Sequence, residues 1–318
     1  MGQSIYTTHF SRLADGNLYS TLCSRLSLDG YTFSKSLRKL RRRNDPHFRV
    51  VIQPAKMDTA KRRVNQRYGA HFPNRYYPDL EFYLYNQEGL TVFNTQAVEV
   101  YHQERLIAFS FFDAGRDSLY SKIAIYDPVY QRHSLGIYTM IKEVEWAMKR
   151  GMAYYYPGYV VPGYAEFDYK HRIGPLECLD LRNGTWKPYA DFRPEDIPLQ
   201  AMIQKLESLA SAFQRQGILY RLNYNRFLDL PLIQPLAEAT YLTYPVYLTF
   251  SRPGQDRAGN AVYDFVNYRF EWLAARFYAY QEPNTEGAPP GLLVLVTGHL
   301  HQADTVEDFI RLLSEGNN

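Results

Sequence analysis

The clearest alternation of apolar and polar positions lies in the middle of the chain. Three mostly apolar runs cover residues 97–101, 106–112 and 119–126, and two short polar segments, 102–105 and 113–117, separate them. Apolar runs of this length that are bounded by turn residues are typical of β-strands joined by hairpins. The pattern therefore predicts three consecutive antiparallel strands.

A helix and a fourth strand are predicted next. The spacing predicts a helix from Ser134 or Leu135 to Arg150, and Gly151 has the position of a C-terminal capping glycine. The apolar positions on one face of this helix are Ile137, Met140, Ile141, Val144 and Met148. The apolar, tyrosine-rich run 153–161 then predicts a strand. The fold class is α/β (α+β), and the element order is that of the central unit of the GNAT fold, although many α+β domains share it.

Helical patterns also occur on both sides of this region. Residues 58–72 predict a strongly basic helix, and residues 200–215 predict an amphipathic one. The aromatic run 264–280 is interpreted as a helix, and residues 305–314 predict a closing helix.

Composition narrows the function classes only slightly. The 318 residues carry a net charge of +3 and 16% aromatic residues, with 29 Tyr against 18 Phe. The excess of Tyr fits either clefts that need hydroxyl groups or a core with satisfied hydroxyls. The charge is too small to indicate nucleic-acid binding by itself, so the distribution of charge decides.

The cysteine count and the hydropathy give expectations of absence. Cys23 and Cys178 are too few for a four-ligand zinc site or a disulfide framework, so no metal and no cofactor are expected. Residues 1–16 contain no apolar run, and the longest apolar stretch, 292–296, is too short to cross a bilayer. We therefore expect a cytoplasmic protein with no membrane partner.

The loop before the predicted central helix is a candidate anion site. Gln131, Ser134 and Gly136 fit the Q/R-x-x-G-x-G/A spacing of GNAT pyrophosphate loops, with Ser in place of the first glycine. Free N–H groups at a helix start can bind a phosphate. The alternative is an ordinary Ser N-cap with a glycine nearby.

Several ordered motifs extend the comparison from a fold to a family. The motifs are Ser121–Pro128, which contains Y-D-P, Ser134–Tyr138 (S-L-G-I-Y), Tyr154–Tyr159, Phe167–Lys170, and upstream Phe33–Ser36 and Arg41–Asn44. In this order and at these separations they resemble the arginyl-tRNA–protein transferase family, which includes the bacterial leucyltransferases. The resemblance spans roughly residues 20–190. It implies a GNAT-like domain, in a tandem or duplicated arrangement, and transfer of an arginine- or leucine-class amino acid from charged tRNA to a protein N-terminus.

The sequence departs from the family pattern in three places. The N-terminal cysteine cluster of the family is mostly missing, and Cys23 alone cannot hold a metal. The motif K-M-x-Y-K has Glu166 and Phe167 at its first two positions. Residues from about 195 onward carry no family motif. We therefore expect an N-terminal GNAT-like half with the basic segment (1–90), a C-terminal GNAT-like transferase half (91–192), and a helical or mixed extension of unknown role (193–318).

The implied reaction needs positioning more than acid–base chemistry. A protein α-amine, with a pKa of about 7.7–8.0, attacks an ester that is already activated. A proton acceptor is still required, and the candidates are Asp113, Asp127 and His133. Asp before Pro is also a common turn residue, so Asp127 has a structural alternative.

The resemblance also implies binding surfaces for both substrates. The basic run near residue 40 is the candidate tRNA contact, with a solvated charged face as the alternative; its members are Lys35, Arg38, Lys39, Arg41, Arg42 and Arg43. Gln131, Ser134, Gly136 and Tyr138 are candidates for the terminal adenosine and aminoacyl group, and Tyr138 has a core position as its alternative. By analogy the acceptor site is lined by Tyr159, Glu166, Tyr169 and Lys170, and Glu166 favours a basic or uncharged acceptor.

Two other functions fit the same fold. A GNAT acyl-CoA N-acyltransferase would use the 131–136 loop for coenzyme A, but it has no need of the basic run. A binding protein that has lost transfer activity would explain the missing cysteines and Glu166.

Overall fold

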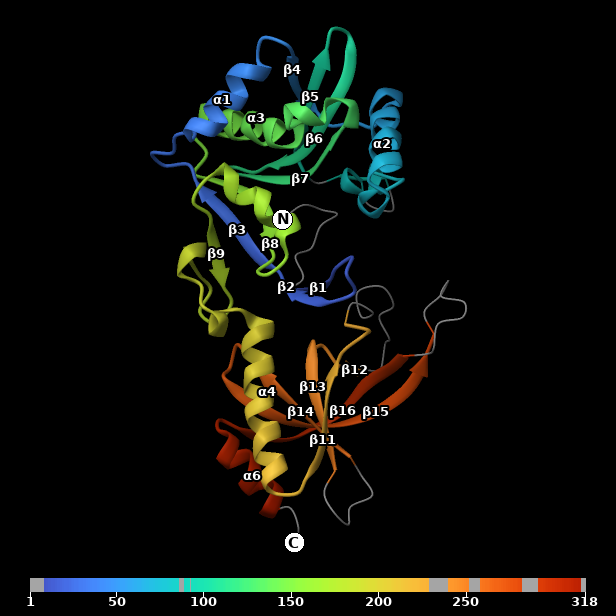
Figure 1. Ribbon diagram of the computed structural model, residues 1–318, viewed down its shortest axis with the longest axis vertical. Coiled ribbons are helices and arrows are strands. Elements are labelled where there is room, and N and C mark those ends of the chain that lie inside the picture. The colour runs from blue at the N-terminus through green and yellow to red at the C-terminus, as the bar shows by residue number, and fades with distance from the viewer. Residues whose placement is uncertain are drawn as a thin grey trace. The chain divides into compact units, whose positions relative to one another are not determined.

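The computed structural model describes residues 9–85, 89–91, 93–228, 240–251, 258–281 and 291–315. The chain divides into two compact units. The N-terminal unit contains residues 1–15, 21–179 and 186–191, and the C-terminal unit contains residues 16–20, 180–185 and 192–318. Figure 1 shows the elements of both.

The N-terminal unit is built on an eight-stranded mixed sheet with the order β10-β9-β3-β8-β7-β6-β5-β4. These strands are β3 (Leu22–Ser27), β4 (Arg49–Pro54), β5 (Thr95–His102), β6 (Arg105–Ala114), β7 (Ser118–Tyr126), β8 (Tyr154–Val160), β9 (Glu177–Asp180) and β10 (Thr185–Pro188). Strands β4 to β7 pair antiparallel in sequence, whereas β7 and β8 pair in parallel. The three predicted strands, the helix and the fourth strand are all confirmed.

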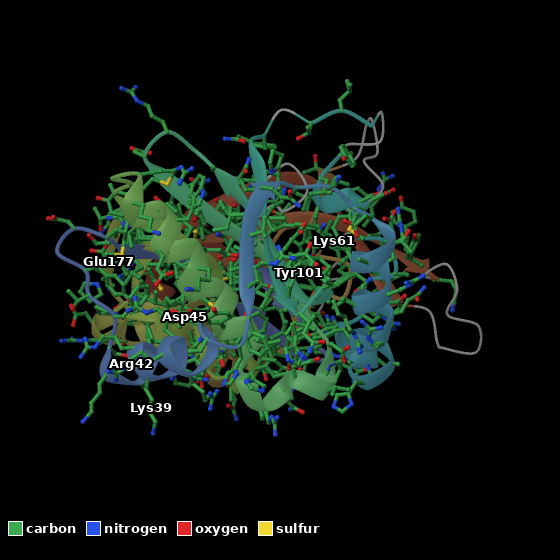
Figure 2. All side chains as sticks on the ribbon, turned by 90° about the horizontal axis from the view of Figure 1, so that it is seen from above. Lys39, Arg42, Asp45, Lys61, Tyr101 and Glu177 are labelled. Carbon is green, nitrogen blue, oxygen red and sulfur yellow. The ribbon has the colours of Figure 1, made fainter. Side chains whose placement is uncertain are left out.

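Helices cover both faces of this sheet. They are α1 (Lys35–Asn44), α2 (Thr59–His71) and α3 (Leu135–Lys149), and Figures 1 and 2 show α1 and α3 on one face and α2 on the other. Strand β6 alternates accordingly. Ser110 and Phe112 face α3, because they contact Glu143 and Trp146, whereas Phe109 and Phe111 pack with Val64 and Tyr68 of α2. Gly151 follows α3 with a φ of 65°, as its capping role requires.

Short 3-10 segments connect these elements. They are η1 (Pro73–Arg75), η2 (Glu81–Tyr83), η3 (Pro128–His133), η4 (Ala165–Ile173), η5 (Tyr189–Asp191) and η6 (Pro194–Asp196). Two short strands, β1 (Phe10–Arg12) and β2 (Leu18–Ser20), precede β3. Segments η3 and η4 carry most of the predicted site residues.

The C-terminal unit has its own antiparallel sheet, in the order β11-β13-β14-β15-β16-β12. The strands are β11 (Leu219–Tyr224), β12 (Thr240–Tyr241), β13 (Val246–Ser251), β14 (Gly259–Asp264), β15 (Arg269–Tyr280) and β16 (Gly291–Ala303). Helices α4 (Pro198–Arg215) and α6 (Val306–Glu315) pack on one face, where Phe213 and Phe309 meet Phe250. Both helices were predicted, so this extension is mixed α/β.

The predicted helix over residues 264–280 is wrong, because the structure places strand β15 there. Phe270 and Trp272 point toward Phe309 of α6, whereas Leu273 packs in a cluster with Val262 and Val294 from the neighbouring strands. Aromatic and branched side chains suit this alternation between two covered faces. The run resembled a helix because both faces are partly apolar, which hides the period of two.

Candidate functional site

Helix α1 presents a row of cations to solvent. Ser34 caps its first turn, since the Leu37 N–H lies 3.4 Å from the Ser34 hydroxyl. Leu37, Leu40 and Asn44 form its buried side. The residues on its outer side are exposed, and these are Lys35, Arg38, Lys39, Arg42 and Arg43. Figure 2 shows Lys39 and Arg42 pointing away from the protein.

Arg41 is the exception among the predicted tRNA contacts. Its guanidinium lies 2.9 Å from Glu145 of α3 and 3.9 Å from Asp45. These ion pairs attach α1 to α3. The geometry therefore favours a structural role for Arg41 and leaves the other five cations available to a ligand.

Asp127 is a buried anchor between three elements. Its carboxylate lies 2.8 Å from Arg67 of α2 and 2.6 Å from Arg105 of β6, and it caps η3 through the Val129 N–H at 3.3 Å. Two guanidiniums that hold one buried carboxylate favour its charged form and leave it little freedom to accept a proton. The geometry favours the structural alternative for Asp127.

The loop that precedes α3 has an open glycine. Ser134 adopts a left-handed conformation, with φ 49° and ψ 50°, and its side chain does not cap the helix. A Cβ placed on Gly136 would meet no atom within 4 Å, so Gly136 borders open space. Gln131 is exposed beside it. These three residues form an accessible helix start, as the anion-site interpretation requires.

Tyr138 and His133 are fixed by contacts with the end of α1. Tyr138 is fully buried, and its hydroxyl donates to Asp45 at 2.8 Å, which favours the core alternative. The His133 ring lies 3.3 Å from the Asn44 side chain. Burial lowers the pKa of His133, and the neighbouring Arg132 and Arg43 lower it further.

Asp113 lies at the end of β6 in a polar cluster that the sequence did not reveal. It is buried and accepts hydrogen bonds from Thr95 at 2.6 Å and from Lys122 of β7 at 3.2 Å. Burial lowers the pKa of Lys122, and Asp113 opposes this shift by stabilising the cation. Lys122 also donates to the Tyr83 carbonyl.

Lys170 is held at a glycine in β8. Its side chain is 7% exposed, and Nζ donates to the Tyr159 carbonyl at 2.5 Å. Burial lowers the pKa of Lys170 to about 7. A Cβ on Gly158 would lie 3.4 Å from this Nζ and 4.0 Å from the Tyr120 hydroxyl, and Gly158 has a φ of 93°. Only glycine suits this position, and its surface brings Lys170 and Tyr120 together.

Tyr120 joins these two clusters into one site. Burial raises its pKa, and electrostatic interactions with Cys23, Tyr159 and Asp113 raise it further. The predicted residues Asp113, Tyr159 and Lys170 therefore share one neighbourhood. Sequence reasoning missed Tyr120, Lys122 and Gly158. The period of two in β7 places Tyr120 and Lys122 on one face, and that signal was present in the sequence.

The other predicted acceptor residues lie at a more exposed position. Glu166 is half-exposed and lies 3.1 Å from Arg75. Tyr169 is also partly exposed. Arg75 was not predicted, and it partly neutralises the charge on which the acceptor argument rests.

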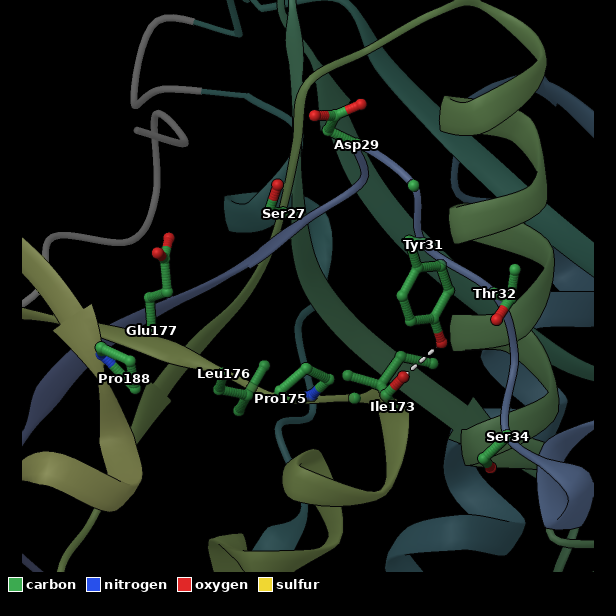
Figure 3. A pocket seen from close by; sticks show the side chains of 12 residues that line it. Ser27, Asp29, Tyr31, Thr32, Ser34, Ile173, Pro175, Leu176, Glu177 and Pro188 are labelled. Carbon is green, nitrogen blue, oxygen red and sulfur yellow. Dashed lines mark hydrogen bonds between the residues drawn. The ribbon is translucent and has the colours of Figure 1, made fainter.

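A separate cleft of about 500 Å³ lies where the loop after β3 meets the end of η4 (Figure 3). Asp29, Tyr31, Pro175 and Glu177 are among its lining residues, and the Tyr31 hydroxyl donates to the Ile173 carbonyl. None of the predicted site residues lines this cleft. It is a feature apart from the Lys170 site.

The same region of the chain matches a known family. Residues 50–180 match the family model described as "Arginine-tRNA-protein transferase, C terminus". The chain carries an arginine-tRNA-protein transferase C-terminal domain. This transferase domain contains both Asp113 and Lys170, together with the η3 loop, whereas α1 precedes it.

Named relatives agree with the family. An aspartate/glutamate leucyltransferase of Acinetobacter baumannii is 35% identical over 101 residues, which are 31% of this chain and 36% of that protein. One from Phenylobacterium zucineum is 29% identical over 184 residues, covering 54% of this chain and 70% of the relative. The chain thus spans about a third of the length of the Acinetobacter relative.

Solved structures are more distant. L-PGS from Bacillus licheniformis superposes with a TM-score of 0.34 at 11% identity, over 53% of this chain and 58% of that one. A similarity of this size supports no conclusion about function. Within the ranges that the structure describes, no helix is long and apolar enough to cross a membrane. In those same ranges, no three His, Cys, Asp or Glu side chains gather as a metal ion would require.

Proposed function

We propose that the chain transfers an aminoacyl group from aminoacyl-tRNA to the α-amine of a protein N-terminus. The observation that carries this proposal is the buried Lys170 amine at Gly158, inside the transferase domain. The donor amino acid belongs to the arginine or leucine class, as in the named relatives.

The site lies beside the place where β7 and β8 pair. Their parallel pairing covers Ser118–Tyr120 and Tyr154–Tyr156, and Lys122 and Gly158 lie just beyond it. We propose that this unit is GNAT-like, with η3 and the start of α3 receiving the phosphate end of the donor. Gln131, Ser134 and Gly136 would contact that end, and the five free cations of α1 would contact tRNA phosphates.

Lys170 supplies the proton acceptor in this mechanism. The acceptor nitrogen attacks the ester carbonyl carbon, a C–N bond forms, and the bond from that carbon to the ribose oxygen breaks. Neutral Lys170 takes the proton that the nitrogen loses and returns it to the leaving ribose oxygen. An amine with a pKa of about 7 is suited to both steps near neutral pH. Asp113 and Lys122 keep the neighbouring wall polar.

The proposal is tested with Lys170→Met, which keeps the volume and removes the base. We expect kcat/KM to fall about 100-fold, within the usual range for a general base. Wild-type kcat/KM should rise as the pH increases through 7, since Lys170 must lose its proton to act. The variant should keep only the rise at higher pH that belongs to the acceptor amine.

The matched control is Lys149→Met, at the exposed end of α3. It should leave both the rate and the pH profile unchanged. A Lys170→Met enzyme with wild-type kcat/KM would remove Lys170 from the mechanism.

Donor and acceptor classes are resolved in one assay. The protein is mixed with labelled Arg-tRNA, Leu-tRNA or acetyl-CoA, and with peptides that begin with Asp, Glu, Lys, Arg or oxidised Cys. Label that passes to peptide only from tRNA supports the proposal. Label from acetyl-CoA alone would establish an acyltransferase instead, and tRNA binding without transfer would establish a binding protein.

We further propose that Glu166 and Arg75 together set the acceptor preference. Glu166→Lys removes the anion, and Arg75→Gln exposes it. The first variant should shift the peptide preference toward acidic N-termini, and the second should shift it toward basic ones. Identical peptide profiles in both variants would exclude this pair from selection.

The division of labour along the chain is also a proposal. Residues 1–90 supply the basic segment, 91–192 supply the transfer site, and 193–318 form an extension. Both segments before residue 193 contribute strands to the single large sheet.

A further inference from the structure

Five rings gather where the end of α1, the β5–β6 turn and η3 meet. Phe48 is buried, and four other rings surround it; this Phe48 ring cluster consists of His47, Phe48, His102, Tyr130 and His133. The ring centroids of His133 and His102 lie 5.0 Å and 5.8 Å from that of Phe48, at 78° and 86° to its plane. The mechanism above uses none of these contacts.

The outer rings form a partly exposed aromatic surface. The His102 Nδ1 and the Tyr130 hydroxyl lie 2.9 Å apart, and their rings are 5.6 Å apart. His47 and His102 are exposed, and Tyr130 is partly exposed. Surfaces of this kind bind unpaired nucleobases by stacking, worth about 1–3 kcal/mol for each base.

The charges around the cluster suit a phosphate backbone. Arg43 donates to the Arg132 carbonyl at 3.0 Å, and the Arg132 Nε lies 3.2 Å from the His133 ring. Arg42 and Arg49 are exposed nearby in the chain. The acidic groups of the packed elements all lie close to cations, in the pairs Asp45–Lys142, Glu145–Arg41, Asp127–Arg105 and Glu104–Arg49. The excess charge is positive.

We infer that the Phe48 ring cluster binds an unpaired nucleotide of single-stranded RNA, and that protonation of His47 and His102 strengthens this binding. A base stacks on the His102 and Tyr130 rings, and its phosphates meet the imidazoliums and Arg132. This inference rests on the proposed use of an RNA substrate, and it names where a single-stranded part of that RNA lies.

The direction of the pH effect follows from ordinary imidazole chemistry. The His side chain titrates near pH 6.5, and each protonation adds a cation facing the phosphates. An anionic ligand favours the protonated form, so affinity should increase as the pH falls through this range. Rings combined with cations favour RNA over an acidic peptide, which needs no stacking surface.

The test measures binding of a fluorescent single-stranded RNA tetranucleotide by anisotropy between pH 8.0 and 5.5. We expect the wild-type Kd to fall about tenfold over this range, in excess of the change for a blunt RNA duplex. His47→Gln/His102→Gln should lose most of this pH dependence while its Kd at pH 8.0 stays within about twofold. Tyr130→Leu should weaken binding at every pH and keep the dependence.

A matched control is His71→Gln/His301→Gln, which removes two imidazoles outside the cluster. It should behave as wild type, and thermal unfolding checks that all variants are folded. Three results would overturn the inference: no oligonucleotide binding, an unchanged pH dependence in His47→Gln/His102→Gln, or an acidic peptide of equal charge that binds as tightly. Transfer from charged tRNA is measured separately at pH 8.0, so proton-linked binding without transfer overturns only the proposed function.

Discussion

Helices α1 and α2 are both strongly basic in sequence, yet the structure uses their charges in opposite ways. In α1 five of six cations face solvent. In α2, Lys61 is 0% exposed and pairs with Glu99 at 2.5 Å and Asp58 at 2.8 Å, whereas Arg67 pairs with the buried Asp127 at 2.8 Å. One helix keeps its charge for a ligand, and the other spends most of it on the fold.

Acidic residues from elsewhere in the chain cause this difference. Glu99 comes from β5 and Asp127 follows β7, and both lie on the sheet face that α2 covers. Burial alone would raise the pKa of Glu99, but hydrogen bonds from Lys61 and Tyr101 outweigh burial, and the pKa is lowered. A run of cations therefore indicates a nucleic-acid surface only where no carboxylate arrives from another element.

The strongest test of this comparison is Lys61→Met. It leaves Glu99 buried without its cation, so we expect a loss of about 3–5 kcal/mol in unfolding free energy. Burial should then raise the pKa of Glu99 in the variant. Since protonation would relieve the unpaired charge, the loss measured by urea denaturation should be larger at pH 8 than at pH 5.

The double variant Lys61→Met/Glu99→Leu should recover most of that loss, because an apolar pair of similar volume replaces the ion pair. A Lys61→Met protein that is as stable as wild type would show that the pair does not hold α2 to the sheet.

Asp127→Asn tests the second anchor of α2. The amide keeps the shape but loses the charge that Arg67 and Arg105 share, so we expect a loss of about 1–3 kcal/mol. The variant should retain the pH dependence of transfer on Lys170. Loss of that pH dependence, with the fold intact, would restore Asp127 as a proton acceptor.

Lys39→Gln/Arg42→Gln sharpens the comparison from the side of α1. Two lost phosphate contacts should reduce the salt dependence of tRNA binding by about 1.8 and weaken it by at least roughly tenfold. The matched pair on α2, Arg62→Gln/Arg63→Gln, should change the affinity by less than about twofold. Equal losses in the two variants would mean that both helices contact RNA.

Arg62→Gln gives the smallest expected effect. Arg62 pairs with Glu81 at 2.5 Å, but both side chains are about half exposed. The loss of unfolding free energy should therefore be below about 1 kcal/mol. A loss as large as that of Lys61→Met would show that exposure does not separate the two pairs.

Local patterns were sufficient for much of the fold and part of the site. The strands of the central sheet, α3 and the capping Gly151 follow from apolar periodicity and turn residues. The motif order located the transferase domain before any contact was known. Strand β15 was missed because a strand that is covered on both faces no longer alternates.

The sequence by itself determined the secondary structure of the transferase region, the family and the positions of the basic runs, because these depend on neighbours along the chain. Only the tertiary structure decided which charges are free, that Lys170 loses its solvent at Gly158, and that three histidines surround Phe48. Each of these depends on groups brought together from distant segments, whose burial and mutual distances set their charge states.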